Sequence, residues 1–204
     1  MQRDYRLIEI PYIRIDEAAD LLARAMAEDR IVAHLIPEQT KDRYAMLKAL
    51  FRTACLEKLF ASQPILGIEW DNKIVALALV VGTYTPTPSE SLKRDRIKLA
   101  EVVGEKVMAR LEEYRTLKKS HLPPRLHYYL QTLAVDPTFQ RMGFGTVLLE
   151  HLYERALDDR TTAGIMLDTD AERNQVFYER NGYTASSTAK LGGVKVAFMY
   201  RAVR

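Results

Sequence analysis

The run QRMGFG at residues 140–145 is the part of the chain best suited to binding an anion. Residues 127–135, just before it, are rich in Tyr, Leu, Thr and Val, which favours a strand. From Gly145 onward, apolar residues recur at three- and four-residue spacing, which indicates a helix. Glycine lets an anion approach the backbone, and the unpaired N–H groups of a first helical turn attract it. The run therefore predicts a turn that binds pyrophosphate, with a plain glycine turn as the alternative.

Two common nucleotide-binding motifs do not fit this run. Thr146 and Val147 follow the second glycine, where a triphosphate-binding loop needs Lys and then Ser or Thr. Leu148 stands where a dinucleotide fingerprint needs its third glycine. Neither motif therefore identifies a ligand, and a plain glycine-containing turn between strand and helix stays the alternative.

Two blocks of the chain resemble motifs of the GNAT superfamily, the acetyl-coenzyme A-dependent N-acetyltransferases. Residues 133–149, LAVDPTFQRMGFGTVLL, are similar to motif A, and they match each fixed position of its loop pattern Gln/Arg-x-x-Gly-x-Gly/Ala. Residues 174–183, NQVFYERNGY, are similar to motif B, with an Asn, an aromatic-Tyr pair, and a Gly followed by an aromatic. The resemblance implies an acyltransferase that uses acetyl-coenzyme A as co-substrate and needs no metal.

The resemblance also implies an α/β fold of the GNAT type. That fold has a mixed, strongly twisted central sheet, helices on both faces, and strands splayed apart at the coenzyme cleft. The predicted elements are a strand at residues 5–10, a helix at 18–29 capped by Asp16, a helix at 41–60, and a hairpin of strands Ile65–Trp70 and Lys73–Val81 around Asp71 and Asn72. Their order agrees with the family fold.

A helical insertion before the motif A strand, at about residues 83–125, distinguishes the chain from a minimal member of the family. Its ends carry prolines, and residues 91–119 have the periodicity of one helix or a helix pair. We expect it to form a wall of the acceptor site. A subunit interface and an additional packing element are the alternatives.

Coenzyme binding can be assigned residue by residue only through the resemblance. The main chain of Leu133, Ala134 and Val135 matches the strand that holds the pantetheine arm. Asn174 matches the residue that binds pantetheine or a water, although an Asn near a helix start could also be a cap. Tyr178 matches the proton donor to the departing thiolate, with core packing as the alternative. The loop and helix start supply Gln140, Arg141, Met142, Gly143, Phe144, Gly145 and Thr146.

The general base that takes a proton from the amine is less evident. The family often places Glu or His on the motif A strand, but the chain has Tyr129 and Gln131 there, and neither is a good base at neutral pH. His127 shares their face by strand alternation and has a suitable reference pKa of about 6.5. Glu69 is the second candidate, and a chain of waters is the third possibility.

The composition limits the number of domains and the classes of protein to which the chain can belong. A chain of 204 residues with 48% hydrophobic content suits a single domain, residues 1–204. No long apolar run is present and residues 1–4 do not resemble a secretory signal, so we expect a cytoplasmic protein that does not enter a membrane. The lone Cys55 lies among apolar residues, which favours a buried thiol.

The net charge of +3 is too small to indicate a nucleic-acid partner. The densest cations lie within residues 93–119, including Arg96, Arg115 and Lys118, and a solvated helix face is their simplest interpretation. Contact with the coenzyme or with an acidic substrate is the alternative interpretation.

The resemblance to the GNAT superfamily implies an N-acetyltransferase that moves an acetyl group from acetyl-coenzyme A to a primary amine, by direct attack in a ternary complex, and we expect the amine to belong to a small molecule. A protein or peptide N-acetyltransferase and a non-catalytic acyl-coenzyme A-binding module are the alternatives. The resemblance also allows a homodimer.

Overall fold

A seven-stranded sheet runs through the centre of the computed structural model, which describes residues 5–84 and 87–203. Residues 1–4, residues 85 and 86 of the predicted linker, and residue 204 therefore lie outside the described part. The strand order is β1-β2-β3-β4-β5-β7-β6, and β4 and β5 form the one parallel pair in the described sheet. The strands are β1 Tyr5–Glu9, β2 Ile65–Trp70, β3 Lys73–Val81, β4 Tyr128–Val135, β5 Gly164–Thr169, β6 Thr184–Leu191 and β7 Val194–Ala202.

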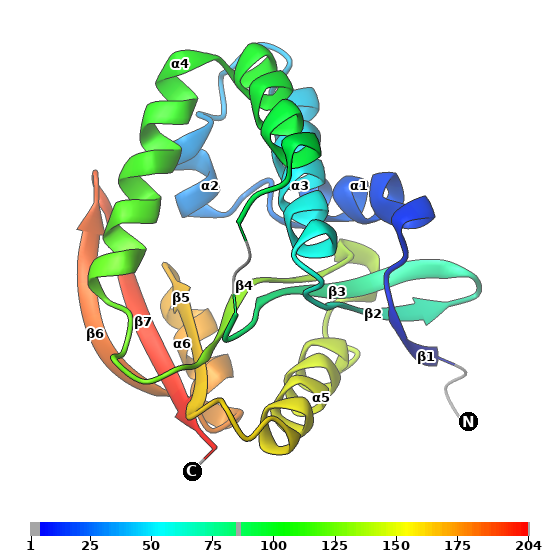
Figure 1. Cartoon of the computed structure of the whole chain (residues 1–204), viewed down its shortest axis with the longest axis vertical. Coiled ribbons are helices and arrows are strands. Elements are labelled where there is room, and N and C mark those ends of the chain that lie inside the picture. Colours follow the sequence, from blue (N-terminus) through cyan, green and yellow to red (C-terminus); the bar gives the residue numbers. More distant parts are fainter. Residues whose placement is uncertain (1–4, 85–86, 204) are drawn as a thin grey trace.

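Helices cover both faces of this sheet (Figure 1). Leu22, Phe51 and Val107, from three helices, are buried with Leu77 of β3 in one hydrophobic cluster. Leu148 and other residues of α5 are buried in a second cluster on the opposite face. The helices are α1 Ile15–Ala25, α2 Arg30–Leu35, α3 Arg43–Phe60, α4 Glu90–Ser120, α5 Phe144–Asp158 and α6 Glu172–Arg180. The predicted mixed α/β fold is confirmed.

The two parallel strands separate after three residue pairs. The last pair is Leu130 with Leu167, and residues 131–135 of β4 have no partner on β5. On its other side β4 continues to pair with β3, where Gln131 is passed over in a bulge. Backbone groups along this edge of β4 therefore face an opening in the sheet. This is the splayed arrangement that the resemblance implied.

The hairpin of β2 and β3 has the predicted bounds. Asp71 and Asn72 both have positive φ, 48° and 60°, as the two central residues of a type I′ hairpin turn require. The expectation for Asp16 was wrong, because α1 begins at Ile15 and Asp16 lies inside its first turn, where Arg52 donates to it. The predicted helix at 18–29 also runs too far, since α1 ends at Ala25.

The stretch before β4 contains the long helix α4, which runs as two arms from a bend (Figure 1). The Ser89 hydroxyl caps its start by accepting from the Leu92 N–H at 3.2 Å. The bend is at Gly104, whose φ of 78° and ψ of 167° lie in a region open essentially to glycine alone. One arm packs along α3 and the other extends toward the sheet, so that α4 arches over the open edge of β4.

No helix in the described ranges combines the length and the apolar composition that crossing a membrane requires.

Candidate active site

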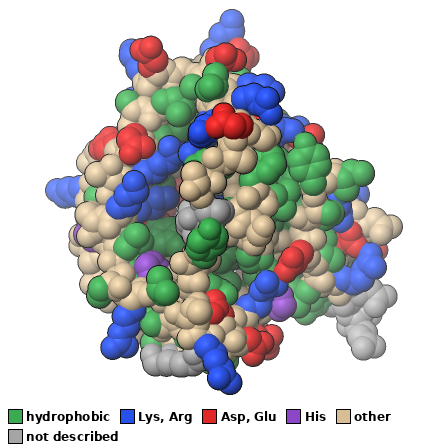
Figure 2. Space-filling model, in the orientation of Figure 1, with side chains coloured by type: hydrophobic (Ala, Val, Ile, Leu, Met, Phe, Trp, Pro, Cys, Tyr) green, Lys and Arg blue, Asp and Glu red, His purple; other side chains and the backbone are tan. Residues whose placement is uncertain are grey.

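A cavity of about 1330 Å³ lies at the opening between β4 and β5. Its walls come from the open edge of β4, the start of α5, α6, the segment around α2, and the helices α3 and α4. Figure 2 shows the hollow on this face of the molecule, with Lys and Arg side chains gathered at its rim. A single drug-sized ligand takes a pocket of roughly 300–1,000 Å³, so this cavity has room for two ligands.

The predicted phosphate-binding run forms the turn into α5. Gly143 is the N-cap residue of α5, with φ of 88° and open space where a Cβ would lie. Arg141 also has positive φ, 63°, and such turns direct successive N–H groups into one concavity. Most of the predicted loop residues line the cavity, whereas Met142 packs against the second hydrophobic cluster.

The second glycine has a packing role. A Cβ at Gly145 would lie 3.1 Å from the Cζ atom of Phe177, a tight contact that the ring could relieve only by shifting a few tenths of an ångström, so glycine favours the close approach of α6 to α5. Phe177 in turn lines the cavity next to the loop. Glycine is therefore favoured at the two positions for different reasons. Gly143 has a positive φ, and Gly145 lies in close contact with Phe177 of α6.

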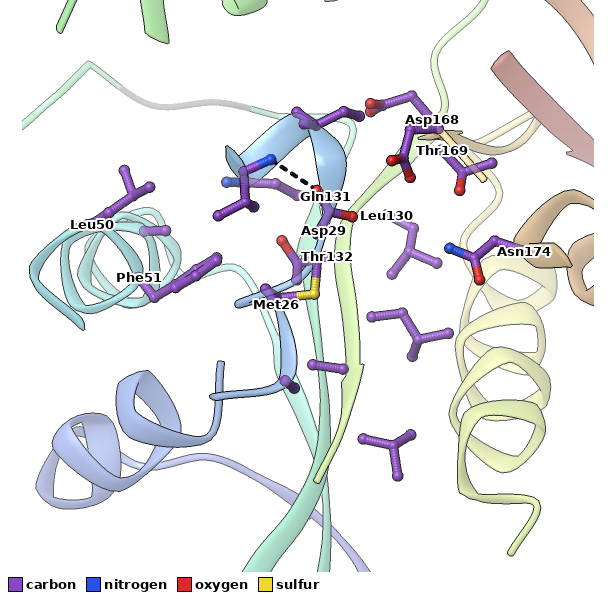
Figure 3. Close-up of a pocket in the computed structure, with 18 of the residues that line it drawn as sticks. Met26, Asp29, Leu50, Phe51, Leu130, Gln131, Thr132, Asp168, Thr169 and Asn174 are labelled. Carbon is purple, nitrogen blue, oxygen red and sulfur yellow. Dashed lines mark hydrogen bonds between the residues drawn. The ribbon is translucent and has the colours of Figure 1, made fainter. Parts of the chain in front are cut away.

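The open edge of β4 passes through the middle of the cavity. Leu133, Ala134 and Val135 line it, as do Gln131 and Thr132 (Figure 3). Pairing with β3 keeps this edge in place from behind. Unpaired backbone groups here are available to an extended ligand that lies along the strand.

Helix α6 presents Asn174 and Tyr178 to the cavity. Asn174 is not the helix cap, because α6 begins at Glu172 with Ala171 as its N-cap, and its amide lies toward β4 (Figure 3). Tyr178 stacks edge-to-face with Tyr183 at 5.8 Å between ring centroids. Burial raises the pKa of Tyr178 well above its usual value, so the phenol stays protonated and can act only as a proton donor.

Asp29 lines the cavity from the start of α2, and Gln131 and Thr132 of β4 line it as well (Figure 3). Its Oδ1 atom accepts from the Val32 N–H at 2.9 Å, which makes Asp29 the N-cap of α2. Burial raises the pKa of Asp29 to about 6, and the neighbouring carboxylates of Asp170 and Asp168 add to the rise. A carboxylate with this pKa is mostly ionised at pH 7 and can still take up a proton.

Asp168 and Asp170 reach the cavity from the end of β5. Asp168 accepts from the Tyr114 hydroxyl at 2.5 Å, and its other oxygen accepts from the Tyr129 hydroxyl. Asp170 accepts from the Arg30 N–H at 3.1 Å, which joins β5 to the start of α2. The three carboxylates give this part of the cavity a negative character that favours a cationic amine.

The two predicted bases lie elsewhere. His127 precedes β4, its Nδ1 atom bonds to the Arg125 carbonyl oxygen at 2.8 Å, and it does not line the cavity. Glu69 is held on the β1 side of the sheet by the guanidinium groups of Arg6 and Arg14, which lower its pKa. The structure brings neither residue to the site, and Asp29 takes their place as the candidate base.

The sequence carried partial signals for the acidic residues. Asp168 and Asp170 follow the apolar run Ile165–Leu167, and carboxyl ends of parallel strands commonly border ligand sites. Asp29 stands three residues before Val32, a spacing typical of a cap. In the described ranges, these side chains do not form a group of three that could hold a metal ion.

Comparisons with known proteins agree with this geometry. A family model for the acetyltransferase (GNAT) domain matches residues 94–185, which include both motifs and much of α4. The chain is similar to a crystal structure from Corynebacterium glutamicum, described as histone acetyltransferase HPA2 and related acetyltransferase, at 20% identity and a TM-score of 0.70, over 97% of this chain and 96% of that one.

Two further solved structures share the fold at lower similarity. Arylalkylamine N-acetyltransferase 2 from Aedes aegypti has a TM-score of 0.63 at 16% identity, over 98% of this chain and 100% of that chain. The ribosomal-protein-S18-alanine N-acetyltransferase from Escherichia coli has a TM-score of 0.53 at 15% identity, over 98% and 94%. One name refers to an arylalkylamine and the other to a protein, so the likeness leaves the acceptor to be derived from this chain.

Proposed function

We propose that the chain is an acetyltransferase of the GNAT superfamily, whose domain model matches residues 94–185, and that it transfers an acetyl group from acetyl-coenzyme A to a primary amine of a small molecule, by direct attack within a ternary complex. The observation that carries this proposal is the single cavity that joins the α5 turn and the β4 edge to the carboxylate of Asp29. A donor at one end and an amine at the other would meet beside β4.

The coenzyme fits the residues present. Gly143 leaves space at the N-terminus of α5, where unpaired N–H groups and the helix dipole favour a pyrophosphate. Leu133, Ala134 and Val135 would hold the pantetheine arm through their main chain, in the gap that β5 leaves. Bound there, acetyl-coenzyme A supplies the activated acetyl group as a thioester. The side chain of Asn174 would bind the same arm from α6.

Asp29 and Tyr178 would divide the proton transfers between them. As the new C–N bond forms, Asp29 accepts the proton that the amine nitrogen loses. As the C–S bond breaks, the Tyr178 hydroxyl donates its proton to the departing sulfur. A thiol has a reference pKa of about 8.5, so the thiolate is already a fair leaving group and the Tyr178 proton adds rate without being indispensable.

A small acceptor suits the cavity better than a protein segment. Helix α4 arches over the site, and Asp29, Asp168 and Asp170 lie inside rather than on an open surface. A protein lysine or N-terminus would have to be threaded beneath the helices. Cytoplasmic location and a homodimer stay predictions.

Release of the coenzyme thiol, measured with a panel of small amines, amino acids and peptides, tests the proposal. We expect turnover with small primary amines and binding of acetyl-coenzyme A in the absence of an acceptor. Turnover confined to peptides would identify a protein acetyltransferase instead. Tight coenzyme binding with no turnover across the panel would identify a binding module.

A further inference from the structure

Cations line the part of the cavity beneath α3 and α4. Lys58 comes from α3, and Arg96, Arg115, Lys118 and Lys119 come from α4; Lys119 is exposed, and we refer to the other four residues as the cation group. Figure 2 shows Lys and Arg side chains gathered beside the hollow near α4. Among the described lining residues of these two helices, the acidic side chain is Glu57. This region therefore carries an excess of positive charge.

Two members of the group are neutralised and two are not. The Glu57 carboxylate lies 2.8 Å from an Arg96 guanidinium nitrogen and 3.9 Å from one of Arg115, and Arg115 also lies 3.7 Å from a carboxylate oxygen of Glu112. Within the described ranges, neither Lys58 nor Lys118 takes part in a salt bridge with a carboxylate. Both ammonium groups therefore lack a direct carboxylate partner. Burial lowers the pKa of each, and the charges of Glu57 on Lys58 and of Asp168 on Lys118 offset only part of that fall.

Lys58 is the more unusual of the two. Only 4% of it is exposed, and its Nζ donates to the Gln63 Oε1 atom at 3.4 Å. Burial lowers the pKa of Lys58 to about 8; the charge of Glu57 offsets part of this fall, and the charges of Lys118 and Arg96 add to it. A buried ammonium without a carboxylate at salt-bridge distance is unfavourable, and a directly bound anion would reduce the penalty.

Lys118 lies between the cation group and the carboxylates. Its Nζ stands 4.2 Å from the ring centroid of Tyr114 and 5.5 Å from that of Tyr129. The hydroxyls of both rings donate to Asp168, so that carboxylate is already bonded through both of its oxygens. The cavity consequently has an acidic side around Asp29 and a basic side around Lys58.

The coenzyme phosphates do not account for the basic side. The proposed phosphate turn starts α5, which packs on the opposite face of the sheet from α3 and α4. A pyrophosphate at Gly143 would therefore leave Lys58 unpaired. The anion that this side fits must belong to the other ligand.

We propose that the acceptor carries, besides its amine, a carboxylate or phosphate group that binds Lys58 and Lys118 while the amine faces Asp29. The proposal rests on the proposed function, since it names the acceptor class of the same cavity. An amine with an anionic end matches both sides of the cavity, whereas a simple alkylamine matches only one. Both anions are recognised by the same ammonium chemistry.

Matched acceptors provide the test. A set of ω-amino carboxylates of increasing length is compared with the corresponding phosphonates, neutral amides and unsubstituted alkylamines. Binding to the protein saturated with coenzyme A is measured by calorimetry, and turnover is measured with acetyl-coenzyme A. We expect the best anionic acceptor to bind about tenfold or more tightly than its amide, as a charge-assisted contact predicts. Comparing carboxylate with phosphonate identifies which anion is preferred.

A variant pair locates the effect. Lys58→Met removes the buried ammonium and keeps the side-chain length, and we expect it to abolish the preference for the anionic acceptor over its amide. Lys98→Met removes the same charge from an exposed position of α4 outside the cavity and should keep the preference.

The outcomes separate the two proposals. Equal binding of anionic and neutral acceptors by the unchanged protein would overturn the anion site while leaving acetyl transfer intact. A preference that survives in Lys58→Met would also overturn it. Absence of turnover with every amine would contradict the proposed function, and the calorimetric comparison would still decide whether the anion site exists.

Discussion

The two halves of the cavity are built in different ways. The proposed donor half consists of the α5 turn, the open edge of β4 and α6, and most of it comes from residues 131–146. The proposed acceptor half consists of the start of α2, the end of β5, and the cation group on α3 and α4, which lie far apart in the chain. The donor half would bind its ligand mainly through backbone groups, and the acceptor half would bind its ligand through charged side chains. Changes in one half should therefore leave the binding function of the other intact.

Replacing the candidate base should have the largest effect. Asp29→Asn keeps a side chain that can cap α2 but cannot accept the amine proton, and general bases typically contribute about 10²–10⁴ in rate. We expect kcat/KM to fall by about a hundredfold or more, with helix content unchanged by circular dichroism. Wild-type turnover in Asp29→Asn would remove Asp29 from the mechanism.

The pH dependence provides a separate check on the same residue. Because burial raises the pKa of Asp29 to about 6, kcat/KM should rise with pH through that value as the carboxylate ionises. The folded state also favours the protonated form, so the stabilisation from Asp29 is present at low pH and lost as the pH rises through about 6. In Asp29→Asn, both the rise of kcat/KM with pH and this change in the free energy of unfolding should disappear. If kcat/KM of the variant still rises with pH through about 6, the titrating group is a residue other than Asp29.

The next largest effect is expected in the donor half. Gly143→Asp forces positive φ on a residue with a Cβ and places a carboxylate beside the proposed pyrophosphate site, so acetyl-coenzyme A affinity should fall by about a hundredfold. Gly193→Asp is the matched control, since its position has open space, no positive φ and no part in the cavity. Equal affinities of the two variants in calorimetry would show that the turn does not bind the coenzyme.

Loss of the Tyr178 hydroxyl should have a moderate effect. Tyr178→Phe keeps the ring contact with Tyr183 and removes the proton donor, and we expect kcat to fall by about tenfold because the thiolate can leave unaided. The comparison is a rate measurement at saturating coenzyme. A loss as large as that of Asp29→Asn would make Tyr178 essential, and an unchanged kcat would assign it to packing alone.

The smallest effect should come from the bend in α4. Gly104→Ala forces a backbone conformation that residues with a Cβ avoid, and such strain amounts to roughly 1–3 kcal/mol. We expect a lower free energy of unfolding in urea and a KM for the amine raised a few-fold, with coenzyme affinity unchanged. Gly82→Ala, where a Cβ meets open space without positive φ, serves as control. A changed coenzyme affinity in Gly104→Ala would mean that the two halves are mechanically coupled.

The same contrast explains what the sequence predicted. The hairpin of β2 and β3 and the turn into α5 were found because local rules determine them: two adjacent positive-φ residues in one case, and glycines between a strand and a helix in the other. These features depend on residues that are neighbours in the chain, so a motif of a few residues is sufficient to predict them.

The acceptor half was missed for a physical reason. Helix α2 has six residues, too few for a helical period to be visible, so its cap Asp29 was taken as the end of the preceding helix. The hydrogen bonds of Asp168 come from Tyr114 and Tyr129, which lie on other elements, so its environment is determined only by the folded chain. His127 was chosen by strand alternation, but β4 begins one residue later and the imidazole bonds to the Arg125 carbonyl.

The central claim is that one cavity holds a donor and an acceptor on separable halves. Its most direct test is the affinity of acetyl-coenzyme A, measured by calorimetry on Asp29→Asn and Gly143→Asp together with their amine turnover. We predict that Asp29→Asn binds the coenzyme as the unchanged protein does and fails in turnover, whereas Gly143→Asp fails in coenzyme binding. If Asp29→Asn lost coenzyme affinity to the same extent as Gly143→Asp, the division of the cavity into two halves would be wrong.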